Sequence, residues 1–236
     1  MEEAKEETRA KEWYVPRFGP RRFRLLVGLS FYPYTLMNLS YVVIGSLLAP
    51  FVHFDRVAGM ALVYLLGVGV TAHSLDAMAP NKPWGTFITR HQLLLLAVTG
   101  LVPALVLGLY YALVYAPLLL VVGGLELFFL FSYNLELFRG RFHTNLWFAL
   151  SWGFLPVIAG YVAQTNAVGL ASLVGGAFGF CSAYVEINAS RPYKTLKKEG
   201  SHLGSAFASR FESILKAVVA SVLAVAVVLY ALRFLG

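Results

Sequence analysis

The sequence predicts an all-α, polytopic transmembrane helical bundle of about seven helices. Of its 236 residues, 58% are hydrophobic and 13% are charged, whereas a soluble domain has roughly 45–50% and about 25%. The apolar residues also gather in long uncharged runs, and a bilayer core needs about 20 consecutive apolar residues per helix. These two observations exclude a water-soluble globule. Cys181 is the single cysteine, which excludes an intrachain disulfide and a site of several thiolates.

The first 24 residues are polar and charged, and they lack the apolar core that a cleaved leader would need. Their first half is acidic, and the second half carries four arginines next to the first apolar run: Arg17, Arg21, Arg22 and Arg24. Basic residues in this position bind anionic headgroups. We therefore expect an N-terminal arm over residues 1–24 and a transmembrane domain over residues 25–234.

Five runs with few or no charges follow the arm, at residues 25–49, 57–75, 92–135, 144–185 and 211–232. The third run is too long for one span and predicts a hairpin that turns near residues 110–117. The fourth run is divided by the polar cluster at residues 164–166. Each of these two runs predicts a pair of helices, which brings the total to seven.

The distribution of basic residues agrees with seven helices. All 19 Lys and Arg residues except Arg56 and Arg233 then fall on the side of the N-terminus. Because short cytoplasmic loops are enriched in Lys and Arg, we expect a multi-pass protein of the cell membrane with its N-terminus in the cytoplasm and its C-terminus outside. The net charge of +7 is thus attributed to topology, and nucleic acid is not an expected partner.

Ionisable residues at or near the hydrocarbon region are costly and are candidates for function. His73 and Asp76 end the second helix and share a face, because they are three residues apart. They form either a site for a divalent cation or a proton, or a hydrogen-bonded helix end. Glu126 lies two turns before Tyr133 on the fourth helix. It is either a protonated carboxyl hydrogen-bonded between helices or a group that binds a ligand, a metal or a proton.

Several basic residues on the same side are candidates for holding a diphosphate group, and they are Lys82, Arg90, Arg139, Arg141, Arg191 and Lys194. They are either phosphate ligands or topological charges on anionic lipid. Glu186 and Asn188 precede Arg191 in a loop expected to leave the sixth helix. Oxygen ligands beside cations favour an anion bridged by Mg²⁺.

Two features concern packing. Gly175 and Gly179 are spaced for close contact between helices. Pro156 is expected to kink the fifth helix and to open room beside it.

Three segments resemble, in their order, the UbiA superfamily of intramembrane prenyltransferases. They are AHSLDAMAPNKPWGT at residues 72–86, YNLELFRGR with HTNLWFALSWGFLPVIAGYVAQT at residues 133–165, and YVEINASRPYK at residues 184–194. The resemblance covers about residues 25–232 and implies the family's helical fold with its last two of nine helices absent. It also implies a polyprenyl diphosphate as substrate, Mg²⁺ as cofactor, and an aromatic or lipid-like acceptor.

The resemblance implies roles for the candidate residues as well. Asp76 and Glu186 would hold Mg²⁺, and His73, Asp76 and Tyr133 would act in catalysis. The substrate would be bound by Lys82, Arg90, Glu126, Arg139, Arg141, Asn188, Arg191 and Lys194. The chain departs from the family's two Asp-rich motifs, because Asp55 and Asp76 are its only aspartates.

Three functions follow. The first is a divergent prenyltransferase at the cytoplasmic face, and the second is a non-catalytic protein of the same fold that binds an isoprenoid lipid or a membrane partner. The third is a small proton-coupled transporter that uses Glu126 and His73.

Overall fold

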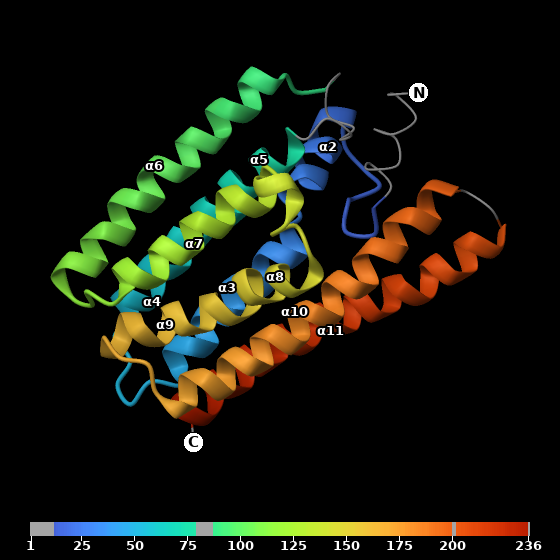
Figure 1. The fold of residues 1–236 in the computed structure, drawn as a ribbon. Helices are drawn as coiled ribbons and strands as arrows, with labels where there is room; N and C mark the ends of the chain where they lie inside the picture. The colour runs from blue at the N-terminus through green and yellow to red at the C-terminus, as the bar shows by residue number, and fades with distance from the viewer. Residues whose placement is uncertain (1–11, 79–86, 200–201, 236) are drawn as a thin grey trace.

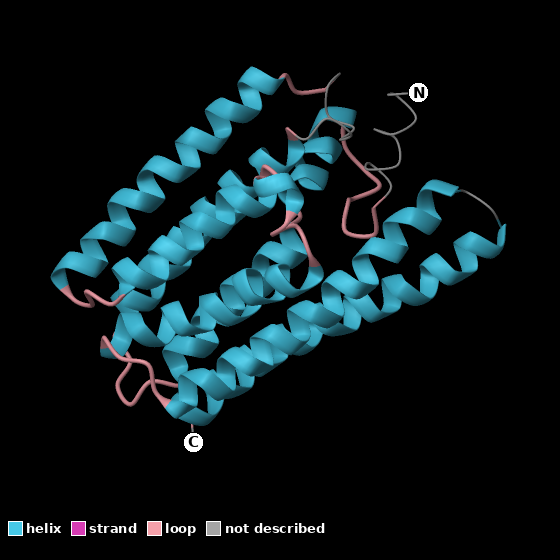
Figure 2. Ribbon diagram, in the orientation of Figure 1, coloured by secondary structure: helices cyan, strands magenta, loops and turns pink. Residues whose placement is uncertain are grey.

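The computed structural model describes residues 12–78, 87–199 and 202–235. Their regular structure is helical throughout (Figure 2). In chain order the elements are α2 (Arg21–Ser30), α3 (Tyr32–Leu47), α4 (Phe54–Tyr64), η1 (Leu65–Ala72), α5 (His73–Ala77), α6 (Arg90–Val114), α7 (Leu119–Asn134), η2 (Phe138–Gly140), α8 (Asn145–Ala149), η3 (Leu150–Phe154), α9 (Leu155–Thr165), α10 (Leu170–Glu199) and α11 (His202–Phe234).

These elements form seven antiparallel segments within the described residues, because α2–α3, α4–η1–α5 and α8–η3–α9 each continue end to end (Figure 1). The predicted number of helices is confirmed. Five of the segments are long and apolar enough to cross a bilayer, and α7 is a shorter apolar helix. The chain is therefore a helical membrane bundle.

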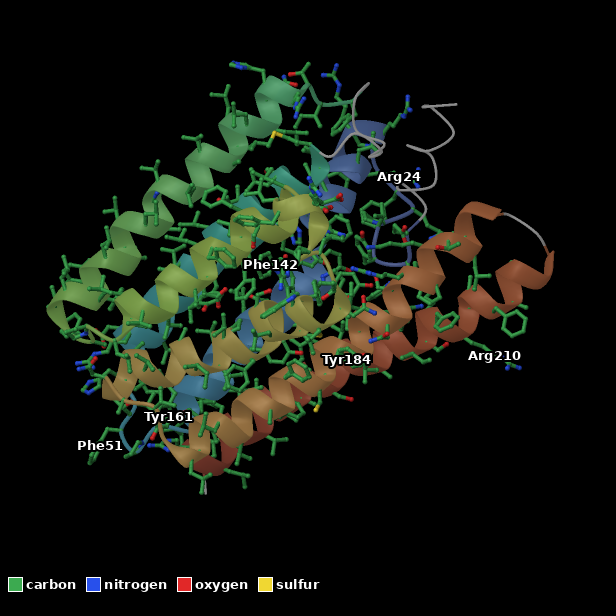
Figure 3. All side chains as sticks on the ribbon, in the orientation of Figure 1. Arg24, Phe51, Phe142, Tyr161, Tyr184 and Arg210 are labelled. Carbon is green, nitrogen blue, oxygen red and sulfur yellow. The ribbon has the colours of Figure 1, made fainter. Side chains whose placement is uncertain are left out.

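The α10–α11 pair lies at one edge of the bundle and α6 at the opposite edge (Figure 1). Between them, α3 packs against α9 and α11, while η1 and α4 pack against α6. Figure 3 shows Arg24 and Arg210 at one end of the bundle and Phe51 and Tyr161 at the other. We call the end that holds the start of α2, the end of α5 and the end of α10 the basic end.

Glycines bring η3 and α10 into backbone contact. A Cβ on Gly153 would overlap the backbone carbonyl of Gly179, and a Cβ on Gly179 would overlap that of Gly153. The predicted close contact at Gly179 is thus a contact of α10 with η3. A Cβ on Gly175 would instead meet the side chain of Leu48.

Two segments of π-helix interrupt the bundle. The segment η1 precedes His73 directly, and η3 ends two residues before Pro156. The irregularity predicted beside Pro156 is therefore a local widening of the helix on its N-terminal side. Single π-helical turns inside α-helices are frequent at functional sites.

The prediction of a loop after residue 185 is wrong. The helix α10 continues through Pro192 to Glu199. A proline inside a helix removes one backbone hydrogen bond, but this part of α10 packs along α11. Tyr193 is buried there in the same apolar cluster as Leu215. Tertiary packing thus keeps the segment helical.

Residues 12–15 of the N-terminal arm are packed into the bundle. Tyr14 and Val15 are buried in the core cluster of α3, α10 and α11. Glu12 is 5% exposed, and its Oε2 accepts hydrogen bonds from Tyr193 Oη at 2.9 Å and Lys197 Nζ at 3.1 Å. Residues 12–15 therefore cover the core between α3 and the C-terminal part of α10.

Candidate functional site

One cavity of about 490 Å³ opens between α4–η1–α5, α6 and α7 on one side and η3, α9 and α10 on the other. This volume lies within the range of ligand pockets, roughly 300–1,000 Å³. Apolar residues of α4, α6 and α7 form most of its wall. Charged and polar residues gather at the part of the cavity nearest the basic end, and we call them the charged mouth: His73, Asp76, Tyr133, Glu186, Arg191 and Lys194.

Local helix geometry positions the charged mouth. His73 and Asp76 are three residues apart on α5 and lie on one face, as predicted. On α10, Glu186 and Lys194 are eight residues apart, which is close to two turns. The continuation of α10 beyond residue 185 therefore turns both side chains toward the same cavity.

Tyr133 lies at the centre of the charged mouth. Its ring stacks on that of His143, with 4.4 Å between the centroids. Its hydroxyl interacts with Arg191 and lies within electrostatic range of Asp76 and Glu186. Arg191 Nη2 also donates to the backbone carbonyl of His143 at 3.2 Å. Side chains of α5, α7 and α10 thus meet around one tyrosine.

His73 is held by a hydrogen bond and by aromatic rings. Its Nε2 lies 3.0 Å from Thr35 Oγ1. Its ring packs between Phe31, at a centroid distance of 5.0 Å, and Trp152, at 5.7 Å. Phe31 has a left-handed backbone, with φ 44° and ψ 40°, at the junction of α2 and α3. A non-glycine residue in this conformation costs roughly 1–2 kcal/mol.

Glu186 is 4% exposed, and its Oε2 has no hydrogen-bond partner in the described part of the chain. Leaving a buried polar group unpaired is costly, and the positive charge of Lys194 lies within electrostatic range of this carboxyl. Glu186 therefore offers a free oxygen at the edge of the cavity.

The carboxylates of the charged mouth fit Mg²⁺ if substrate phosphates and waters supply its other ligands. The described residues contain no group of three or more His, Cys, Asp or Glu that could hold a metal ion. However, Mg²⁺ is often bound by one or two carboxylates together with substrate phosphates and waters. Asp76 and Glu186, which face the same cavity, match that mode.

Other predicted residues are placed elsewhere. Asn188 is exposed, accepts from Asn145 Nδ2 at 2.8 Å and does not line the cavity. Arg90, Arg139 and Arg141 are exposed and also lie outside the cavity wall. Lys82 lies outside the described residues.

Sequence reasoning missed several residues of the cavity wall. Tyr64 donates to Glu126 Oε1 at 2.8 Å, and Trp152, His143 and Ser190 also line the cavity. The need of a carboxyl such as Glu126 for a hydrogen-bond donor was a usable signal, but it did not single out Tyr64 among 13 tyrosines. His143 offered no signal apart from its place before the fifth helix.

Comparisons with protein-family models, with curated proteins and with solved structures found no match to this chain.

Proposed function

We propose that this protein is a UbiA-like membrane prenyltransferase that binds a polyprenyl diphosphate with its head at the charged mouth and its chain along the apolar wall. The observation that carries the proposal is that one cavity has a charged end and an apolar remainder. A ligand with an anionic head and a long apolar chain matches this division. The resemblance of residues 72–86 and 133–165 to the superfamily supports the same conclusion.

The diphosphate would be bound by charges from two helices. Arg191 and Lys194 provide positive charge on α10. Asp76 and Glu186 would hold Mg²⁺, which when bound supplies positive charge to the diphosphate oxygens. Such preorganised charge stabilises a leaving group as its negative charge develops.

In the reaction, the bond between C1 of the prenyl chain and the diphosphate oxygen breaks, and its electron pair leaves with the diphosphate. The acceptor then donates an electron pair to C1 and loses a proton. Phe31, Tyr34 and Trp152 line the cavity beside the mouth, and aromatic faces stabilise a nearby cation. His73 would take the proton, since it lines the charged mouth next to Phe31 and Trp152.

The orientation is part of the proposal. Among the described residues, Arg56 and Arg233 lie at the end opposite the basic end, and Arg233 donates to the Leu47 and Pro50 carbonyls there. The positive-inside rule then puts the basic end, with the charged mouth, in the cytoplasm. Water-soluble Mg²⁺ would reach the site from that side.

A second candidate is a non-catalytic isoprenoid-binding protein. The small number of carboxylates favours it. Within the part of the chain that the structure describes, only Asp76 and Glu186 are carboxylates of the charged mouth, whereas the UbiA superfamily, which the sequence resembles, has two Asp-rich motifs. Binding without turnover would support this candidate.

The test is calorimetric titration of the detergent-purified protein with geranylgeranyl diphosphate, with and without MgCl₂. We expect Mg²⁺-dependent binding that is weakened at least about tenfold in D76N. D55N is the matched control, because Asp55 is exposed at the opposite end of α4–η1–α5. Equal binding by wild type and D76N would refute the assignment of the site. Release of pyrophosphate on addition of a membrane lipid extract would separate catalysis from binding alone.

A further inference from the structure

The cavity holds a second polar group, away from the charged mouth. Glu126 lines the cavity from α7, seven residues before Tyr133. Seven residues of α-helix span about 10 Å along the axis. The carboxyl of Glu126 therefore lies deep along the apolar part of the wall, where the proposed prenyl chain would run.

The hydrogen bonding of Glu126 is incomplete. The Tyr64 hydroxyl donates to Oε1 at 2.8 Å, and Tyr64 is itself buried. Within the described residues no hydrogen bond reaches Oε2, and neither ion pair, Lys197–Glu12 or Lys216–Glu212, involves this carboxyl. A carboxyl oxygen facing a purely apolar chain would lose its hydrogen bonding to water without replacement, which is unfavourable.

The space around Glu126 is kept open by glycines. A Cβ on Gly67, Gly123 or Gly124 would meet nothing within 4 Å, and all three glycines line the cavity. Gly67 lies in η1, whose first residue follows Tyr64 directly. The free oxygen thus faces room for a ligand rather than a packed side chain.

We propose that Tyr64 and Glu126 form a second subsite that binds the uncharged hydroxyl group of a membrane lipid. A hydroxyl can both donate and accept a hydrogen bond, so it pairs with Oε2 whether or not the carboxyl carries a proton. The inference rests on the proposed function, because it takes the same cavity to hold a lipid. The hydroxyl belongs either to a second lipid, the acceptor, or to the diphosphate-bearing lipid itself.

The first experiment compares dodecan-1-ol with dodecane, which share a chain and differ in the hydroxyl. Each is added to the full-length protein in detergent, and the unfolding temperature reports binding, because a ligand of the native state raises it. We expect the alcohol to bind wild type about tenfold more tightly than the alkane. Equal stabilisation of the wild-type protein by both compounds would overturn the proposal.

Variants assign the preference to the subsite. E126L should lose the preference for the alcohol while it keeps alkane binding, and E126Q should retain it, because the amide still forms hydrogen bonds. E136Q is the matched control, since Glu136 is exposed in the loop after α7. A preference that persists in E126L would refute the role of Glu126.

A final titration identifies the source of the hydroxyl. Geranylgeranyl diphosphate with MgCl₂ is added to protein saturated with dodecan-1-ol. If the affinity for the diphosphate is unchanged, the cavity holds both molecules at once, which supports a hydroxyl on a second lipid. If the two compete, the cavity holds only one of them, which supports a hydroxyl on the diphosphate-bearing lipid. A failure of the proposed function would appear in a different experiment, the titration of wild type and D76N with and without MgCl₂. The two experiments are independent because Asp76 and Glu126 occupy different parts of the cavity.

Discussion

The contact between Gly153 and Gly179 allows a sharp test of how the site is held together. In G153A, the new methyl group would overlap the backbone carbonyl of Gly179. A backbone carbonyl cannot rotate away as a side chain can, so η3 and α10 must separate. These two segments carry Trp152 and Glu186, which both line the cavity. G153A should therefore reduce both stability and binding.

The expected change in the stability of G153A follows from two opposing effects. Alanine is a better helix former than glycine by about 1 kcal/mol. Overpacking costs typically 1–3 kcal/mol, and a gap of about 0.5–1 Å between the helices forfeits a quarter to a half of their dispersion attraction where they touch. Because helices in membranes associate mainly by such packing, we expect a net loss of about 1–2 kcal/mol in G153A.

The matched control is G123A, where the added methyl group meets nothing within 4 Å. That substitution retains the gain in helix propensity and should leave stability unchanged or raise it by up to about 1 kcal/mol. The assay is unfolding in dodecyl maltoside titrated with sodium dodecyl sulfate, followed by circular dichroism. Equal stability of G153A and G123A would refute the inference that backbone contact fixes η3 against α10.

Three further predictions concern other parts of the molecule. E12Q should release residues 12–15, so that trypsin cleaves after the exposed Arg17 about fivefold faster; an unchanged rate would show that the ion pair does not hold the arm. Q164A should destabilise the protein by about 1–3 kcal/mol in the same detergent titration, because Gln164 Oε1 accepts from the His53 backbone N–H at 2.7 Å; wild-type stability would contradict this. N188A should bind geranylgeranyl diphosphate with Mg²⁺ within about twofold of wild type by calorimetry, because Asn188 does not line the cavity, and a tenfold loss would place it in the site.

The sequence was a good guide to the number of helices, because charges are excluded from the hydrocarbon core. It was a poor guide to where helices end. The uncharged run of the sixth helix stops at Val185, but α10 continues for 14 residues to Glu199. That continuation contains Pro192 and several charges, and it is held by packing against α11, which local sequence does not reveal.

The same error explains why Asn188 was predicted in the site although it does not line the cavity. Once residues 184–194 are helical, Glu186 and Lys194 fall close to one face, while Asn188 is displaced by about 200° around the axis from Glu186. A loop leaves these orientations open. Tyr64 was missed for another reason: it is an uncharged residue inside an apolar run, and the π-helix that follows it has no sequence signature.

Because α10 is continuous, it links ligand binding at the charged mouth to the docking of residues 12–15. Lys194 lines the cavity, while Lys197, one turn later, pairs with Glu12 of the N-terminal residues. A ligand that shifts this helix at the mouth also shifts the surface on which residues 12–15 dock, because no hinge separates the two positions. Thermodynamic reciprocity then applies: whatever factor the ligand imposes on the docking of residues 12–15, their docking imposes on the affinity for the ligand.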